Sequence, residues 1–128
     1  MSRQPTIVIS RYTRAEAIHD GVLVDVSDLA REAGFVLPVA LTQPVYDTYV
    51  RVPPDVECQD EIGRLWDILF LLRAAIRSRR PSQAQDEIHF EVLVRNDNLA
   101  AGVVALKAVC GPGDDDEAVV TVLLPHED

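Results

Sequence analysis

One hundred and twenty-eight residues, 48% of them hydrophobic and 26% charged, predict one globular domain over residues 1–128. The formal net charge of −9 argues against nonspecific binding to nucleic acid or to an anionic membrane, because both need a cationic surface. The N-terminal residues lack the apolar stretch of a signal peptide, and no apolar run approaches the ~20 residues of a membrane span. Two cysteines make no disulfide framework. We therefore expect a cytoplasmic protein.

The N-terminal segment predicts short elements. Residues 6–9 have the composition of a short strand. Thr13 and Glu16 have the spacing of a capping box, which predicts a short helix that ends before Gly21. The β-branched residues of 22–26 then predict a brief strand.

Two further short helices are expected before residue 55. Ser27 or Asp28 is suited to cap the first of them, and Gly34 follows it where a left-handed cap is common. Thr42 is suited to cap the second, which ends before Pro53.

The main helix is predicted over about 59–79. One stripe at helical spacing should face the core, formed by Ile62, Leu65, Leu69, Leu72 and Ile76. Trp66 and Phe70 form a second stripe, which either packs under the N-terminal helices or lies exposed and forms a homodimer. The sequence leaves monomer and homodimer open. Arg64 and Asp67 stand three residues apart and are expected to pair on the helix surface.

The remaining chain has the alternation of β-strands. Three runs, about 88–95, 103–110 and 119–124, are separated by turn residues and predict a three-stranded antiparallel meander over about 88–124. We expect the long helix to pack on one face of this sheet, with a short N-terminal strand as a further member. The fold class is therefore predicted to be α+β.

Charge is unevenly distributed. Six carboxylates and no base occur in the last eighteen residues, four of them consecutive: Asp114, Asp115, Asp116 and Glu117. Solubility explains such a run; a contact with a basic protein, or imitation of nucleic acid, is the functional alternative. The one basic cluster, formed by Arg73, Arg77, Arg79 and Arg80, complements the dipole at the end of the long helix or else contacts phosphate or an acidic protein.

No motif for catalysis, phosphate binding or metal binding is present in the sequence. We therefore expect no cofactor, no metal site and no catalytic residue. The best candidates for a polar pocket between the N-terminal helices and the sheet are Tyr12, Arg14, Asp20 and Arg64.

Several distinctive segments together resemble one family: YTRAEAI (12–18) with DGVLVDV (20–26), AREAGF (30–35), PVALT (38–42), GRLWD (63–67) and CGPGDD (110–115). This is a family of small uncharacterised acidic proteins, with a domain of unknown function, from bacterial plasmids, phages and integrated mobile elements. The resemblance covers most of the chain. It implies a mobile-element setting, in which small acidic proteins are often accessory or anti-defence factors, and it assigns no catalytic residue.

Two functions remain at this point. The first is a non-enzymatic accessory domain that binds a protein partner with a basic groove and antagonises a host complex that handles nucleic acid or acts in defence. The second is a small enzyme or ligand binder that uses the polar pocket.

Overall fold

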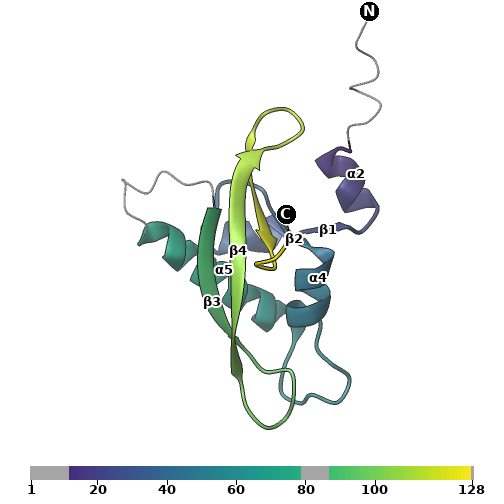
Figure 1. Ribbon diagram of the computed structural model, residues 1–128, viewed down its shortest axis with the longest axis vertical. Helices are drawn as coiled ribbons and strands as arrows, with labels where there is room; N and C mark the ends of the chain where they lie inside the picture. Colours follow the sequence, from purple (N-terminus) through teal and green to yellow (C-terminus); the bar gives the residue numbers. More distant parts are fainter. Residues whose placement is uncertain (1–11, 79–86, 128) are drawn as a thin grey trace, which may run out of the picture.

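In the computed structural model, residues 12–78 and 87–127 are described, and they form one mixed sheet with helices packed on it (Figure 1). The sheet has five strands in the order β1-β2-β5-β4-β3. The strands are β1 (Leu23–Asp25), β2 (Val39–Thr42), β3 (Glu87–Val94), β4 (Gly102–Pro112) and β5 (Ala118–Leu123). The strand expected at residues 6–9 and the last residue of the predicted helix, Arg79, lie outside the described residues.

The prediction of a three-stranded meander needs correction, because the sheet has five strands. Strands β3, β4 and β5 do pair antiparallel in sequence order. Strand β2, which was not predicted, pairs parallel with β5, and β1 adds antiparallel to β2. The α+β fold class is confirmed, and its sheet joins both ends of the chain.

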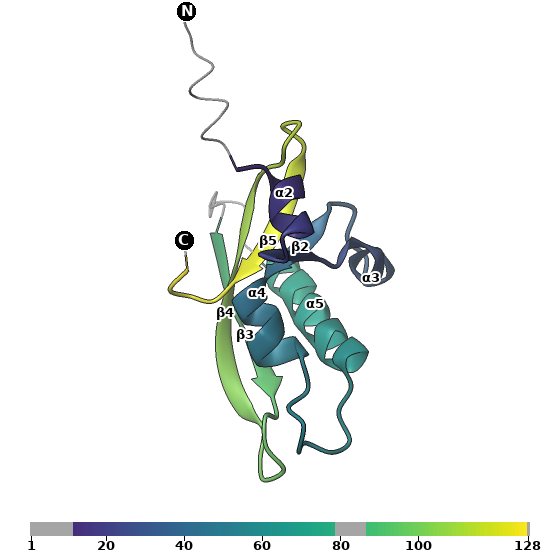
Figure 2. The same cartoon turned by 90° about the vertical axis from the view of Figure 1, so that its right-hand side faces the viewer.

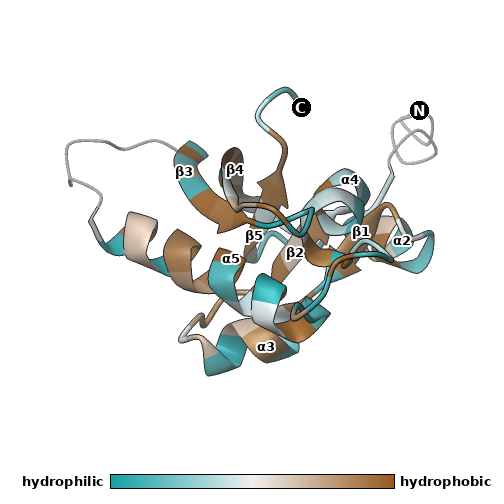
Figure 3. Cartoon of the chain, turned by 90° about the horizontal axis from the view of Figure 1, so that it is seen from below, coloured by the Kyte–Doolittle hydropathy of each residue, from teal (hydrophilic) through white to brown (hydrophobic). Residues whose placement is uncertain are grey.

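The helices are α2 (Arg14–His19), α3 (Ser27–Glu32), α4 (Gln43–Val45), which continues as the π-helical turn η1 (Tyr46–Val50), and α5 (Glu61–Arg77). Seen along the sheet, α5 and α3 lie on one side of it (Figure 3), while α2 lies near the start of β5 (Figure 2). The long helix thus begins two residues later than the predicted 59–79, and among the described residues it ends at Arg77, with Ser78 as its C-cap.

Local signals fixed some helix ends and misplaced others. The capping box is confirmed, since the Thr13 hydroxyl accepts from the Glu16 amide and the Glu16 carboxylate accepts from the Thr13 amide. Ser27 is not a cap. Its hydroxyl instead donates to Asp25 and accepts from the Val39 amide, which ties the start of α3 to β2.

Of two further predicted helix ends, the side-chain cap expected from Thr42 is wrong and the glycine cap at Gly34 is confirmed. Thr42 makes no cap hydrogen bond, because its hydroxyl donates to Glu127 Oε1 at 2.8 Å. Gly34 ends α3 as expected, with φ at +104°. A Cβ at this position would also come within 2.5 Å of Arg73 Nε, but this is the end of a flexible side chain, so the left-handed φ is what favours glycine here.

The core lies between α5 and the sheet. Helix α5 buries a stripe that is rotated from the expected one: Leu65, Leu69 and Leu72 are buried as predicted, but Ile68 completes the stripe and Ile62 is 64% exposed. Facing it from the sheet are Val39, Leu41, Phe90, Val92, Leu106, Ala108, Val120 and Val122. The predicted alternation of β3 is confirmed, with Phe90 and Val92 inward.

The second face of the sheet is covered at one end. Arg14 of α2 reaches Thr121 on this face, and the C-terminal turn reaches Thr42. Val119, Leu123 and Lys107, the one lysine of the sequence, are all buried there. The chain therefore uses its N-terminal helix and its C-terminal turn to shield what α5 cannot.

Candidate functional site

The acidic turn between β4 and β5 is bound to the first helix. The Asp114 carboxylate accepts hydrogen bonds from the backbone amides of Arg14 and Ala15, at 2.7 and 2.9 Å. These amides belong to the first turn of α2, where helix N–H groups have no partner within the helix. Asp114 therefore acts as a structural cap supplied by a distant part of the chain.

The turn itself is ordered by its own backbone and by Glu117. The Gly113 amide donates to the Glu117 carbonyl at 2.6 Å, and the Asp115 amide donates to Glu117 Oε1 at 3.0 Å. Asp116 adopts a left-handed conformation, with φ at +64°, which aspartate tolerates better than most residues. Two of the four consecutive acids, Asp114 and Glu117, thus use their carboxylates to hold the turn in place.

The other two carboxylates, those of Asp115 and Asp116, are exposed, and their side chains make no hydrogen bond or ion pair with the described residues. They are presented to solvent by a turn whose backbone is fixed on both sides.

Arg14 secures α2 to the sheet. Its guanidinium donates to Thr121 Oγ1 at 2.7 Å and to the Val120 carbonyl at 3.0 Å. Burial lowers the pKa of Arg14, while the nearby carboxylates of Asp25, Asp114 and Glu117 act in the opposite direction. Arginine stays protonated in proteins in any case, so this cation offsets part of the acidic charge around the turn.

Tyr12 and Asp20 are brought together as a pair at the two ends of α2. The Tyr12 hydroxyl donates to Asp20 Oδ2 at 2.7 Å, and this bond, aided by the negative charge, raises the pKa of Tyr12. Both side chains are exposed. This hydrogen bond therefore connects the residue before Thr13, the N-cap of α2, to the C-cap residue Asp20.

Arg64 does not join this group. It is 6% exposed, and its guanidinium donates to the carbonyl of Tyr49 at 2.8 Å, to the carbonyl of Arg95 and to Asn96 Oδ1. Desolvation lowers its pKa. The expected surface pair with Asp67 is therefore wrong: the side chain points inward and holds η1, α5 and the β3–β4 connection together.

Sequence reasoning missed the asparagines of that connection, which it treated only as turn residues. Asn96 Nδ2 donates to the Thr48 carbonyl at 2.9 Å. Asn98 bridges to the 51–60 loop, accepting from the Glu57 amide at 2.9 Å and donating to the Asp55 carbonyl at 2.6 Å. These contacts span more than forty residues, so no local spacing indicated them.

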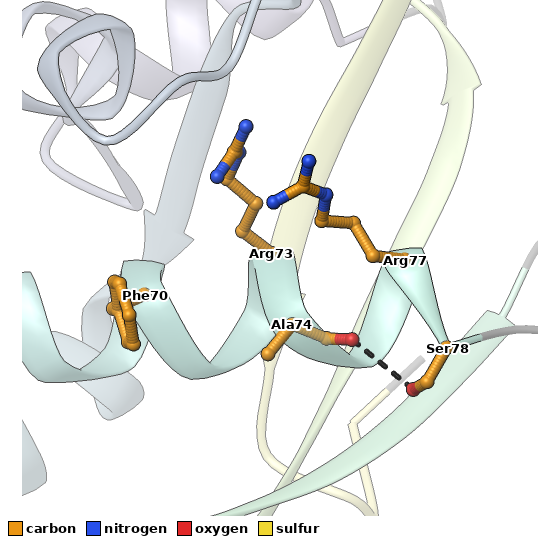
Figure 4. Close-up of a pocket in the computed structure, with 5 residues that line it drawn as sticks. All are labelled: Phe70, Arg73, Ala74, Arg77 and Ser78. Atoms are coloured by element: carbon orange, nitrogen blue, oxygen red, sulfur yellow. Dashed lines mark hydrogen bonds between the residues drawn. The ribbon is translucent and has the colours of Figure 1, made fainter.

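The basic cluster lies at the end of α5. Arg73 and Arg77 project from the same side of the helix and line a surface groove of about 380 Å³ together with Phe70, Ala74 and Ser78 (Figure 4). Arg80, predicted as a further member of this cluster, lies outside the described residues, as does Arg79. The Ser78 hydroxyl donates to the Ala74 carbonyl and closes the helix.

Within residues 12–78 and 87–127, no three His, Cys, Asp or Glu side chains are grouped as a metal site would need. Cys58 is a free, exposed cysteine and Cys110 a free, half-buried one. None of the described helices is both long and apolar enough to cross a membrane.

Comparison with curated proteins and with solved structures finds no match. One family does match, over residues 3–128, which is nearly the whole chain. Its members share a domain to which no activity is assigned. On this match the chain belongs to the family of unknown function DUF6573.

Proposed function

We propose that the chain is a non-enzymatic accessory domain that binds a protein through the β4–β5 turn. The observation that carries the proposal is the fixed backbone of this turn, which presents Asp115 and Asp116 to solvent. A preorganised binding segment loses little conformational entropy on association.

The charge of the turn defines the partner. Carboxylates on a rigid projection complement a cationic groove, steer its approach and repel acidic proteins. Such a groove is typical of proteins that bind the phosphates of nucleic acid. The resemblance to proteins of mobile elements makes a host complex that handles nucleic acid, or acts in defence, the partner we propose.

The structural roles of Asp114 and Glu117 support this function indirectly. If all four acids served solubility alone, none would need a fixed position. Here two of them hold the turn against α2 and against its own backbone, and the remaining two are held outward.

Charge neutralisation tests the proposal. The variant Asp115→Asn/Asp116→Asn removes two charges and keeps the shape of the turn, because asparagine also tolerates the left-handed conformation. The control, Glu32→Gln/Asp55→Asn, removes two exposed charges elsewhere. Both are used with the wild type for affinity capture from host cells, followed by quantitative mass spectrometry.

We expect the wild type and the control to retain a protein with a basic surface that is released at high salt, and the turn variant to lose it. Equal capture by the turn variant and the control would show that the turn is not the binding segment. A turn variant that fails to fold would be recognised by its circular dichroism.

A further inference from the structure

Helix α5 leaves an apolar stripe exposed to solvent. Ile62, Trp66 and Phe70 are 64%, 36% and 56% exposed. Their spacing of four residues puts them on one side of the helix, one turn after another. Phe35, the large apolar residue that follows α3, is buried in the core and does not cover the stripe. A contiguous exposed apolar patch of this kind marks an interaction surface.

The two ends of the stripe carry opposite charge. At the N-terminal end, a surface groove of about 190 Å³ is lined by Cys58, Gln59, Asp60, Gly63, Arg64 and Asp67. Arg64 turns inward to the Tyr49 carbonyl, so the two carboxylates define the charge of this groove. At the C-terminal end, Arg73 and Arg77 line the groove of Figure 4.

We propose that a second copy of this chain docks on the stripe, with the two α5 helices antiparallel around a two-fold axis. Charge selects both the occupant and its direction. In the antiparallel arrangement, the acidic groove of each copy meets the basic groove of the other, and the same contact forms twice. A parallel arrangement would set Arg73 and Arg77 against themselves. A surface that binds an unrelated partner would not need an acidic groove and a basic groove that match each other.

Side-chain size fits the same arrangement. With the two-fold axis level with Ile68, Trp66 of one copy lies beside Phe70 of the other. Gly63 then lies opposite Arg73, and Ala74 lies opposite Ile62. Small residues opposite large ones let two helices approach closely, and the pair of aromatic residues supplies the apolar centre of the interface.

The oligomeric state tests the dimer directly. In sedimentation equilibrium over micromolar concentrations, we expect the mass to rise from the 14.2 kDa of one chain toward twice that value. Phe70→Asp should hold the mass at one chain with an unchanged circular dichroism spectrum. The control Leu99→Asp changes an apolar residue of the β3–β4 connection that is even more exposed than Phe70, and it should leave the dimer intact. A wild type that stays at one chain mass throughout would overturn the proposal.

A charge exchange tests the pairing without touching the apolar stripe. Asp67 and Arg73 are six positions apart, so they do not meet within one helix. Asp67→Arg and Arg73→Glu should each raise the dissociation constant of the dimer about tenfold. The double variant should return it to within about threefold of the wild type. Additive losses in the double variant would contradict this pairing.

Disulfide trapping tests the direction. In a background without Cys58 and Cys110, a single cysteine at Asp67, near the proposed axis, should cross-link two chains on mild oxidation. A single cysteine at Arg77, far from the axis, should not. Cross-linking at both positions would show a parallel pair, and at neither would exclude this face. The outcome is independent of the acidic turn, which lies on another part of the molecule and is tested separately.

Discussion

The carboxylate of Asp114 lies 2.7 Å from the backbone nitrogen of Arg14, one hundred positions earlier in the chain. The same carboxylate accepts from the next amide, and Arg14 in turn donates to the strand that follows the turn. Helix α2 is only six residues long, too short to be stable alone. Its position therefore depends on these contacts with the β4–β5 hairpin.

Asp114→Ala should lower the free energy of unfolding by about 1 kcal/mol, because two amides of the first turn of α2 lose their acceptor. The change should also raise hydrogen exchange at the amides of Arg14 and Ala15. Asp115→Ala, whose side chain makes no such bond, is the matched control. Equal exchange in the two variants would show that Asp114 is not the cap.

Arg64→Met should lower the free energy of unfolding by about 2–3 kcal/mol, since the part-buried acceptors at Tyr49 and Asn96 lose a charged donor. Arg64→Lys should recover only part of the loss, because an ammonium group cannot reproduce the fork of donors. Urea denaturation measures both. Arg51→Met, at an exposed pair with Asp47, should cost under ~1 kcal/mol.

Elements that depend on near neighbours could be predicted from the sequence. The capping box of Thr13 and Glu16 needs four consecutive residues, and the alternation from Ile88 to Val94 needs seven. The glycine cap at Gly34 likewise depends on the helix directly before it. In each case the signal and the contact lie within one element.

The predictions that were wrong concern residues whose contacts lie in distant segments of the chain. Strand β2 is buried on both faces, so it shows no alternation, and its partner β5 lies near the other end of the chain. Arg64 has a local carboxylate at Asp67 but donates to acceptors 31 and 32 positions away. Ile62 has the right spacing, yet the sheet covers the side of α5 centred on Ile68. For the proposed site in the β4–β5 turn, the acidic run was evident from the sequence. Which of its carboxylates are exposed and unpaired could not be predicted, because that depends on the distant contact with α2.

Leu69→Ala should lower the free energy of unfolding by roughly 2–5 kcal/mol, because Leu69 is fully buried between α5 and the sheet. An equilibrium denaturation series gives the value. Ile62→Ala is the natural comparison, because the same helix exposes this side chain, and it should cost far less. A cost under ~1 kcal/mol at Leu69 would contradict the packing described here.

Asp97 predicts a pH dependence in the β3–β4 connection. Its carboxylate accepts from the amides of Leu99 and Ala100, which lowers the pKa of Asp97. Between this folded pKa and the ordinary value of about 3.9, the unfolded chain binds more protons, so stability rises with pH. The contribution is complete above that ordinary value and is lost as the pH falls through the folded pKa.

Denaturation at several pH values from about 2 to 6 measures this contribution. The stability difference between the wild type and Asp97→Asn should be largest at the upper end of this range and shrink as the solution becomes more acidic. Asp55→Asn, which removes an exposed carboxyl in the facing loop, controls for the change in net charge.

Duplex DNA should show no measurable binding at physiological salt, because a chain of net charge −9 neutralises too few phosphates to release counterions. Fluorescence anisotropy with a labelled duplex measures this. The groove of Arg73 and Arg77 is the described feature most able to reverse the result. Salt-dependent micromolar binding that Arg77→Glu abolishes would assign nucleic acid to that groove.

The parallel pairing of β2 with β5 decides when the fold is completed during synthesis. Val39 pairs with Val120, so β2 has no partner in the C-terminal hairpins until β5, about eighty residues later, has left the ribosome. The β3–β4–β5 hairpins join near neighbours and are able to form first, whereas β1 and β2 must wait with apolar side chains uncovered. In a cell, the emerging N-terminal third is therefore the part most dependent on chaperones.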